Sequence, residues 1–223
     1  MSAFSKSILD QISSPDKDIF YELITAKMQA LCLSKDYFNL RPEEVDLIGS
    51  CISQYKDPSI LDIGCCIGRH SRFALSCNSD SQVDIVERDD ILRRHTFSEL
   101  NVRNAYKSIE EISASYSIIF MMGLGLGVFG NETATKLGLV KIISLLAPQG
   151  TLLIEGGKST PGSFTTQNFQ IKYGSLVDEP FEWGYATFDW FSRFIKKITG
   201  VRIVSVSKTS NGDNYFICKL VRD

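Results

Sequence analysis

The middle of the chain alternates short apolar runs with stretches whose apolar residues recur every three or four positions. Strands are expected at residues 59–63, 82–87, 116–122 and 151–155, with a weaker one around Val102. Helices are expected between them at residues 69–76, 91–100 and 132–146. This alternation predicts parallel strands joined by right-handed crossovers, and the continuous apolar runs predict a sheet that is covered on both faces.

The first fifty residues have a helical pattern. Apolar residues three and four positions apart predict a helix within residues 18–31, on the positions Ile19, Leu23, Ala26 and Ala30. A second helix is expected to begin near Arg41, because Pro42 suits the first helical position and two glutamates follow it.

The last third of the chain does not continue this alternation of strands and helices. Residues 157–182 are rich in Ser, Thr, Gly and aromatic side chains and are expected to form a loop. A helix is expected at residues 187–198, followed by two strands at 201–208 and 214–221. The Asn-Gly pair between these strands favours a tight antiparallel hairpin.

Charge and cysteine content narrow the class of protein. The chain carries 24 Lys and Arg against 26 Asp and Glu, a net charge of −2, whereas nucleic-acid binding relies on concentrated positive charge. No apolar run reaches the length of a membrane span, and residues 1–18 lack the apolar segment of a signal peptide, so a cytoplasmic protein without nucleic-acid or membrane partners is expected. The cysteines form no CxxC pair or zinc-like spacing, so no metal site is expected; they are Cys32, Cys51, Cys65, Cys66, Cys77 and Cys218.

The strongest signal for a ligand site is in residues 60–71. A buried strand is expected to lead there into a glycine-rich turn that is followed by a helix, in the sequence Ile-Leu-Asp-Ile-Gly-Cys-Cys-Ile-Gly-Arg-His-Ser. A dinucleotide fingerprint GxGxxG requires glycine at positions 64, 66 and 69, which are Gly64, Cys66 and Arg69 in this chain. Since one of the three positions matches, a nicotinamide-dependent oxidoreductase is excluded. The pattern DxGxGxG matches at three of four places, with Cys66 replacing one glycine.

In this segment the chain resembles the class I S-adenosylmethionine-dependent methyltransferases. The resemblance continues through residues 68–71, Glu87 at the end of the second strand, 116–127 and 145–155, and covers residues 40–221. It implies an α/β fold with a Rossmann-like, mostly parallel seven-stranded sheet, a C-terminal antiparallel hairpin and an N-terminal helical cap. The cap is expected at residues 1–56 and the cofactor-binding core at 57–223, with a substrate loop at about 157–186.

The resemblance also implies a site for S-adenosyl-L-methionine, with S-adenosyl-L-homocysteine as product. Glu87 lies 23 residues after Gly64 and is expected beside the turn, accepting hydrogen bonds from the ribose. Asp62 is expected to order the turn or to reach the methionine amine, and a Cβ at Cys66 is expected to require a negative φ. The expected cofactor contacts are Asp62, Gly64, Cys65, Cys66, Gly68, His70, Glu87, Arg88, Asn104, Ala105, Met122 and Gly123. For His70 the alternative is a solvent-facing helix residue.

The acceptor is expected to be a small molecule methylated at N or O by in-line transfer, with the aromatic stretch 164–190 as a cover over it. Five residues flank that region as candidate bases: Glu155, Gln167, Tyr173, Glu182 and Tyr185. Of these, Glu155, Tyr173 and Tyr185 are taken as the catalytic candidates. The alternatives are a protein or RNA methyltransferase, or a non-catalytic binding module, and the chain is expected to be a monomer or homodimer.

Overall fold

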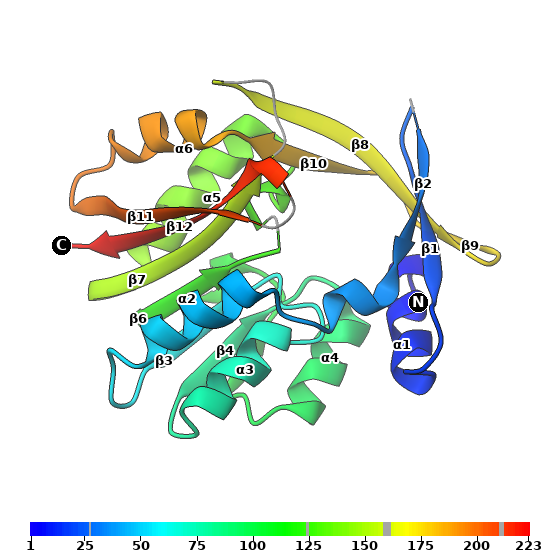
Figure 1. Ribbon diagram of the computed structural model, residues 1–223, viewed down its shortest axis with the longest axis horizontal. Helices are drawn as coiled ribbons and strands as arrows, with labels where there is room; N and C mark the ends of the chain where they lie inside the picture. The colour runs from blue at the N-terminus through cyan, green and yellow to red at the C-terminus, as the bar shows by residue number, and fades with distance from the viewer. Residues whose placement is uncertain (27, 124, 158–161, 210–211) are drawn as a thin grey trace.

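The computed structural model describes residues 1–26, 28–123, 125–157, 162–209 and 212–223. Within them the chain forms two β-sheets and six α-helices (Figure 1). Three short 3₁₀ turns connect these elements: η1 (Ser34–Tyr37), η2 (Ile109–Glu111) and η3 (Gly125–Gly127).

The main sheet has seven strands in the order β11-β12-β7-β6-β3-β4-β5. Their bounds are β3 (Ser59–Ile63), β4 (Gln82–Val86), β5 (Asn104–Tyr106), β6 (Tyr116–Met121), β7 (Leu146–Gly157), β11 (Val201–Thr209) and β12 (Gly212–Arg222). The five strands from β7 to β5 are parallel, and β12 pairs antiparallel with both β7 and β11. This confirms the predicted mostly parallel sheet with a C-terminal hairpin, whose turn residues Ser210 and Asn211 lie outside the described residues.

Helices cover both faces of the main sheet, as the apolar strands predict. They are α2 (Pro42–Ile52), α3 (Arg69–Cys77), α4 (Asp90–Glu99), α5 (Glu132–Ser144) and α6 (Phe188–Ile195). The buried side chains of α2 and α3 share one hydrophobic cluster with the strands, and those of α5 and α6 share another on the opposite face. The helices predicted in these segments are confirmed, including the start of α2 after Arg41.

A second sheet lies across the upper right of Figure 1, beside the helix α1 (Ala3–Ser13). Its strands run in the order β10-β8-β1-β2, with β9 paired to β8. The bounds are β1 (Phe20–Ile24), β2 (Gln29–Leu33), β8 (Phe164–Tyr173), β9 (Leu176–Val177) and β10 (Phe181–Ala186). This sheet joins the N-terminal segment to the segment between β7 and α6.

The helix predicted within residues 18–31 is wrong, because the segment forms the antiparallel pair β1 and β2. Leu23 fits the spacing of a helix and also that of a strand, in which it shares a face with the buried Tyr21. The deciding interaction is distant in sequence, since Leu23 pairs with Ile171 of β8. The pairing with β8 also means that residues 1–56 are not all helical, and the domain boundary at residue 56 stays a prediction.

The loop predicted over residues 157–182 is also wrong for the part that the structure describes. Residues 164–173 and 181–186 form β8 and β10, paired from Phe164 with Ala186 to Phe169 with Phe181. The strand pattern was not recognised because β8 contains the polar residues Thr166, Gln167 and Asn168, which lie on exposed positions of a sheet that is open to solvent on part of its surface. Residues 158–161 lie outside the described residues.

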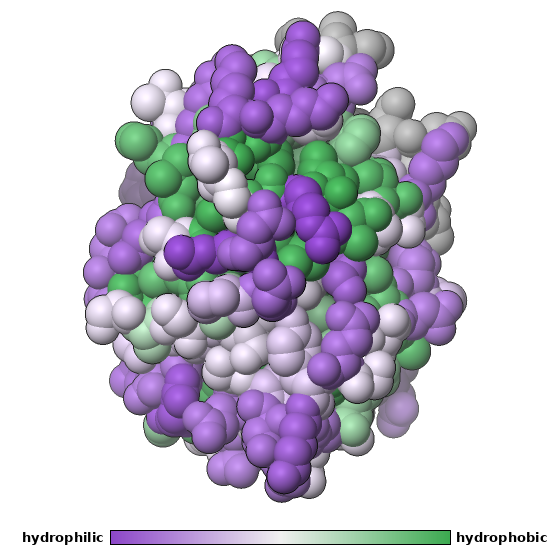
Figure 2. Space-filling model, turned by 90° about the vertical axis from the view of Figure 1, so that its left-hand side faces the viewer, coloured by the Kyte–Doolittle hydropathy of each residue, from purple (hydrophilic) through white to green (hydrophobic). Residues whose placement is uncertain are grey.

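Figure 2 looks at the molecule from the side of α6, β11 and β12 and shows charged and apolar atoms interspersed, with apolar ones gathered in its upper half. Val204 and Val206 of the edge strand β11 are exposed apolar residues. Among the described residues, no helix has the length and hydropathy that a membrane span requires.

Candidate functional site

The turn between β3 and α3 holds three residues in the left-handed backbone region. They are Gly64 with φ 72°, Cys66 with φ 53° and Gly68 with φ 71°. The amides of Gly64 and Cys65 donate to the carbonyl of Val86 in β4, at 2.9 and 3.2 Å, and Gly68 donates to the carbonyl of Cys65 at 2.7 Å. These bonds fix the turn against the end of the neighbouring strand, which is where ligands bind in open α/β sheets.

Cys66 corrects one expectation from the sequence. A negative φ was expected for a residue with a Cβ, yet Cys66 keeps the positive φ that a glycine would adopt. Thr96 of α4 donates its hydroxyl to the carbonyl of Cys66 at 2.7 Å, and the amide of Cys66 donates to Glu87 at 3.0 Å. Both partners hold the backbone in this conformation in spite of the steric penalty.

Asp62 is buried in β3 and orders the start of α3. Its Oδ2 accepts from the Ser71 hydroxyl at 2.6 Å and from the Ser71 amide at 3.2 Å. The amides of Arg69 and His70 stand in the first turn of the same helix, where no earlier carbonyl of the helix can pair with them. Of the two roles expected for Asp62, the structure therefore shows the ordering contacts.

Glu87 follows β4 and turns its carboxylate onto the glycine turn. Oε2 accepts from the Cys66 amide at 3.0 Å, and Oε1 accepts from the Asp89 amide at 2.9 Å. Burial raises the pKa of Glu87, and the two backbone hydrogen bonds oppose that rise. A carboxylate has about four lone-pair directions, so these two bonds leave Glu87 able to accept from a ligand as well.

Beside the turn lies a buried ion cluster that joins α2 to β7. The guanidinium of Arg41 donates two hydrogen bonds to Glu155, at 2.9 and 2.8 Å, and one to Glu44 at 2.9 Å. Glu155 also accepts from the Gly123 amide at 2.8 Å. Both carboxylates are fully buried. Burial lowers the pKa of Arg41, but the hydrogen bonds that it donates to Glu155 and Glu44 outweigh burial and raise that pKa overall. Glu155, a predicted catalytic residue, is thus committed to Arg41.

Arg69 and His70 complete this cluster. His70 Nε2 lies 3.1 Å from Glu44 Oε1, and Arg69 donates to the same oxygen at 3.0 Å. Burial opposes ionisation of Glu44, but the bonds from His70 and Arg41 and the charge of Arg69 lower its pKa. His70 is 5% exposed and its ring contacts Glu44, so the solvent-facing alternative is wrong. Sequence reasoning missed Arg41, Glu44 and Arg69, although the charged residues that flank Pro42 gave a signal.

Asn104 and Ala105 lie inside β5 and not at its carboxyl end. Asn104 pairs with Asp84 of β4 and donates its side-chain amide to that carboxylate at 3.1 Å. Since Tyr106 is the residue opposite Val86, Asn104 is two residues, or about 7 Å, short of the strand end. The structure therefore does not bring Asn104 to the ligand edge, and the positions at that edge are Lys107 and Ser108.

Three further residues expected at the cofactor site, Met122, Gly123 and Arg88, follow the carboxyl ends of β6 and β4. Met122 is buried after β6, and Gly123 has φ 65° with the Arg69 guanidinium 3.7 Å from the place of its missing Cβ. Arg88 follows Glu87 and sets its guanidinium carbon 5.4 Å from the centre of the Phe181 ring, a cation–π contact that reaches the second sheet.

The second sheet turns an aromatic face toward these elements. Trp183 packs on Gly127 of η3, where its indole fills the place of a Cβ. Tyr185 is half-buried, and burial raises its pKa to about 12. Tyr173, another catalytic candidate, donates its hydroxyl to Asp10 of α1 at 2.8 Å, so that group links β8 to α1.

Helix α1 lies between the glycine turn and the second sheet. Its Ile8 is buried against Ile67 of the turn and Leu92 of α4. The Ser2 hydroxyl donates to Asp89 at 2.9 Å, and Asp178, which follows β9, accepts from the first amides of α1. The helix therefore covers the turn from the side opposite the main sheet.

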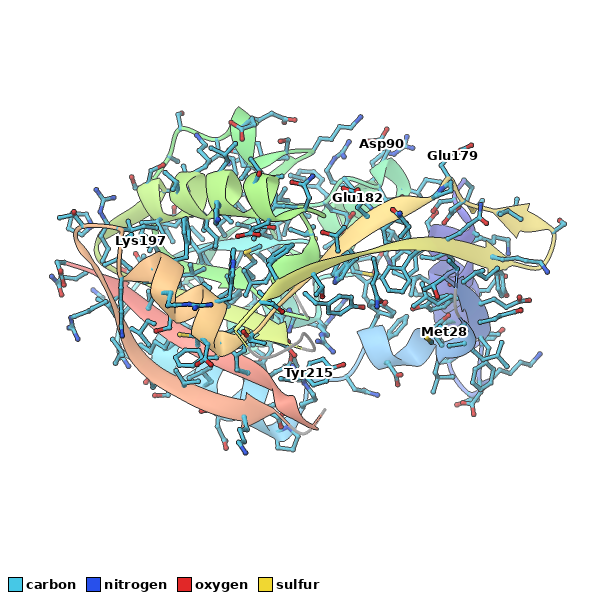
Figure 3. The ribbon with its side chains drawn as sticks, turned by 90° about the horizontal axis from the view of Figure 1, so that it is seen from above. Met28, Asp90, Glu179, Glu182, Lys197 and Tyr215 are labelled. Carbon is cyan, nitrogen blue, oxygen red and sulfur yellow. The ribbon has the colours of Figure 1, made fainter. Side chains whose placement is uncertain are left out.

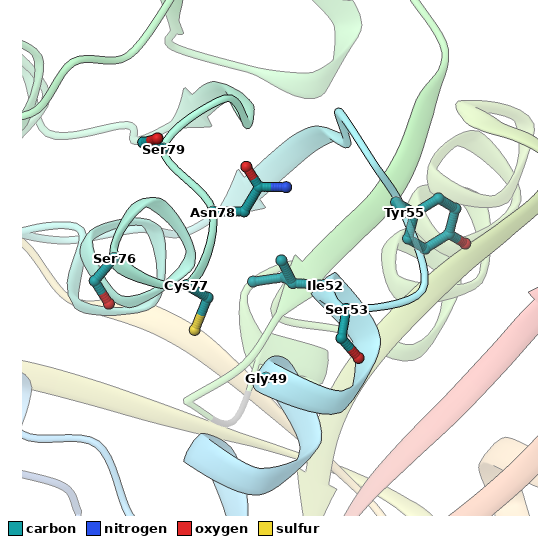
Figure 4. A pocket seen from close by; sticks show the side chains of 8 residues that line it. All are labelled: Gly49, Ile52, Ser53, Tyr55, Ser76, Cys77, Asn78 and Ser79. Carbon is teal, nitrogen blue, oxygen red and sulfur yellow. The ribbon is translucent and has the colours of Figure 1, made fainter.

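An open pocket of about 430 Å³ lies elsewhere, between the ends of α2 and α3 (Figure 4). Its lining includes Gly49, Tyr55, Cys77 and Asn78, and it faces away from the carboxyl ends of the strands. Within the described ranges no group of three His, Cys, Asp or Glu residues is arranged to hold a metal ion. The glycine turn, with its carboxylate and helix N-terminus, remains the candidate ligand site.

The chain matches no known protein-family model, and no curated protein sequence matches it. Among solved structures it is similar to an S-adenosylmethionine-dependent methyltransferase from Bacteroides fragilis in complex with S-adenosyl-L-homocysteine. The identity is 19%, the TM-score is 0.80, and the match covers 99% of this chain and 94% of that chain. It is similar to an S-adenosylmethionine-bound amino pentose methyltransferase from Micromonospora echinaspora, at 13% identity and TM-score 0.59, over 81% of this chain and 90% of that one.

A third similar structure is the 1,6-didemethyltoxoflavin-N1-methyltransferase of Burkholderia thailandensis. The identity is 13% and the TM-score is 0.59, over 81% of this chain and 77% of that one. These likenesses show that the chain has the fold of the class I S-adenosylmethionine-dependent methyltransferases.

Proposed function

On the basis of this fold and its glycine turn, we propose that the protein is an S-adenosylmethionine-dependent methyltransferase acting on a small molecule at N or O. The observation that supports the proposal most strongly is that the open space at Gly64 and the carboxylate of Glu87 lie on the same turn. A Cβ built at Gly64 meets no atom within 4 Å, so a ligand has room against the backbone there. Glu87 lies beside that space with lone pairs for hydroxyl donors.

The residues present fit this cofactor. A ribose offers two adjacent hydroxyls, and the carboxylate of Glu87 accepts from them while it keeps its bonds to the turn. The first amides of α3 supply positive partial charge at the other side of Gly64. When bound, S-adenosylmethionine supplies a methyl group that its sulfonium charge already activates.

The chain's own contribution is therefore alignment and exclusion of water. Alignment of two reactants supplies about 7–11 kcal/mol in favourable cases. Glu155 is held by Arg41 and by the Gly123 amide, so its role is to fix the end of β7 against the loop after β6. Tyr185 keeps its proton at neutral pH, since its pKa is raised to about 12, and acts as a hydrogen-bond donor.

The acceptors named for similar structures are small molecules. One is an amino pentose and another is 1,6-didemethyltoxoflavin, and both proteins resemble this chain in fold. The cover formed by the second sheet and α1 suits an acceptor of that size, and a protein or RNA acceptor is the alternative outcome.

Equilibrium dialysis with S-adenosylmethionine and S-adenosyl-L-homocysteine tests the proposal. Binding of both at micromolar concentration is expected, and Gly64→Val should abolish it because a branched side chain would fill the ligand space and is strained at φ 72°. Gly174→Val is the matched control, since Gly174 has φ 58° and open space but lies in the β8–β9 turn. No binding by the native protein at millimolar ligand would end the proposal.

A further inference from the structure

Two tyrosine hydroxyls above the carboxyl ends of the main strands have no hydrogen-bond partner among the described residues. Tyr185 is in β10, and Tyr215, labelled in Figure 3, is near the start of β12. Both side chains are half-buried. Tyr21 and Tyr37 of the neighbouring elements differ in this respect, since their hydroxyls share a hydrogen bond of 3.0 Å.

These two phenols come from strands that both contact β7. They are close enough that ionisation of Tyr215 would raise the pKa of Tyr185. Tyr215 also pairs with Gly157 at the end of β7, two residues beyond Glu155. The two hydroxyls therefore belong to one region, next to the end of β7 and under the second sheet.

The face of the second sheet that carries Tyr185 is aromatic. Since residues opposite each other in a sheet share a face, Phe169 and Phe181 lie on it together, and Trp183 and Tyr185 follow at alternate positions. The Phe169 ring centre is 6.1 Å from that of Phe181 and 6.3 Å from that of Tyr185. Phe169 is itself buried, so the partly exposed rings of Phe181, Trp183 and Tyr185 are the ones that can pack a flat ligand with offset or edge contacts.

This face carries no charge of its own. Its described positions, read from the register, are Tyr21, Leu23, Ala30, Cys32, Thr165, Gln167, Phe169, Ile171, Tyr173, Phe181, Trp183 and Tyr185, and none is acidic or basic. The nearby Glu155 is neutralised by Arg41, and Arg88 adds a positive charge at the edge of the Phe181 ring. Asp10 lies at the Tyr173 end of the face, where it is paired with Lys6. An ammonium group placed at the other end, near Tyr185, would therefore have no carboxylate of this face to pair with and would meet Arg88, which is unfavourable for a desolvated charge.

We infer that the acceptor is an uncharged planar heteroaromatic molecule, held flat by the aromatic face and oriented by hydrogen bonds from Tyr185 and Tyr215 to its oxygen or nitrogen lone pairs. The inference rests on the methyl transfer proposed above and narrows its substrate class. Burial raises the pKa of both phenols, so both remain donors through the neutral range. The nucleophilic atom of such an acceptor is already free of an ammonium proton, in agreement with the lack of an uncommitted carboxylate on this face.

The test is calorimetry on the full chain saturated with S-adenosyl-L-homocysteine. The probes are a hydroxyquinoline, which is planar and uncharged, tryptamine, which is planar with an ammonium group, and glucosamine, which is a non-planar amine. The hydroxyquinoline is expected to bind more tightly than the other two. Tyr185→Phe and Tyr215→Phe should each weaken it about 2- to 10-fold, the effect of one neutral hydrogen bond, without changing the affinity for S-adenosyl-L-homocysteine.

Tyr55→Phe is the control, because its hydroxyl donates to the carbonyl of Gln149 at the opposite edge of the sheet. Tighter binding of either amine, equal hydroxyquinoline affinity in the two tyrosine variants and the native protein, or no hydroxyquinoline binding at about 1 mM would each overturn the inference. Those results would leave the proposed function standing as long as S-adenosyl-L-homocysteine binds. Loss of that binding in the native protein would instead overturn the proposed function itself.

Discussion

Glu87 combines a hydrogen-bonding role in the turn with a buried carboxylate at the ligand edge. If it accepts from a ribose, Glu87→Ala removes bonds to a charged group, which are worth about 1.5–3 kcal/mol. We therefore predict that the variant binds S-adenosyl-L-homocysteine about 10- to 100-fold more weakly by calorimetry. Glu99→Ala, on the exposed end of α4, should change nothing. Unchanged affinity in Glu87→Ala would remove the ribose assignment.

The same residue gives the binding a pH dependence. Burial raises the pKa of Glu87 above its ordinary value of 4.5, so the carboxyl takes up a proton at a higher pH than a free glutamate does. The affinity for S-adenosyl-L-homocysteine should hold at neutral pH and fall on acidification, with a midpoint above pH 4.5. In Glu87→Gln that step should be absent, and a step of the same size there would assign it to another group.

Cys66 tests how much the turn tolerates a side chain at positive φ. An L-residue in this region is strained by about 1–2 kcal/mol, more for a β-branched one. In urea unfolding, Cys66→Gly should therefore be more stable than Cys66→Val by at least that amount, and should keep its ligand affinity. Equal stability of the two variants would mean that the backbone relaxes out of φ 53°.

For single residues, the sequence predicted the position in a strand or turn better than it predicted the side chains that the residue contacts. The placement of Asp62, Gly64 and Glu87 followed from strand ends and a glycine turn, which are local features. The environment of His70 did not, because its partner Glu44 is 26 residues away on a helix whose packing the pattern leaves open. The prediction for Asn104 was wrong for a different reason. Because β5 is short and weakly apolar, the sequence left its register against β4 uncertain by two residues.

Between elements, Arg41 is the connection that holds α2 to β7. Breaking a buried ion pair from one side leaves uncompensated charge, which costs about 3–5 kcal/mol. We predict a loss of that size in urea unfolding for Arg41→Ala, because Glu44 and Glu155 are both fully buried beside it. Glu155→Gln in the Arg41→Ala background should recover part of the loss, since one buried charge is then removed.

Two outcomes of this double-mutant cycle on Arg41 and Glu155 would contradict the contact between them. Additive losses in Arg41→Ala and Glu155→Gln would show that the two side chains do not interact. A loss of unfolding free energy below about 1 kcal/mol for Arg41→Ala would mean that the buried pair stabilises the protein no more than an exposed salt bridge does. Lys136→Ala provides that exposed reference, because its partner Glu132 is on the surface of α5.

The elements that the sequence predicted are those with local signals. Helices α4, α5 and α6 begin at the capping side chains Asp89, Asn131 and Thr187. The parallel strands other than β5 are mainly apolar runs bounded by turns. The second sheet lacks both signals, since β1 is held by pairing with β8 about 150 residues later. Tyr173 was expected to flank the end of the main sheet, but it lies in β8 and bonds Asp10 of α1. Tyr185 lies in β10, and the placement of both residues on strands depended on pairing that is distant in sequence.

For the molecule as a whole, α1 is a helix that touches the second sheet, the glycine turn and α4. Its Ile8 is fully buried against Ile67 and Leu92. Ile8→Ala should destabilise the protein by about 2–5 kcal/mol, the range for a large-to-small change in a core, with the largest loss of amide protection in α1. Hydrogen exchange measures this directly.

Leu137→Ala is the matched control for that prediction, because Leu137 is 68% exposed on α5. It should leave both stability and exchange within about 0.5 kcal/mol of the native protein. Unchanged protection of α1 amides in Ile8→Ala would show that the contact with the turn does not hold the helix in place.

The pairing of β1 with β8 has a consequence for synthesis of the chain. The N-terminal end leaves the ribosome first, so β1 cannot pair with β8 until Ile171, the partner of Leu23, has been synthesised. Until then the β1–β2 hairpin has an unprotected edge on each side, and a lone hairpin is marginal in water. The parallel core is free to assemble earlier, so closure of the small sheet is a late event whose rate is governed by loop entropy over roughly 150 residues.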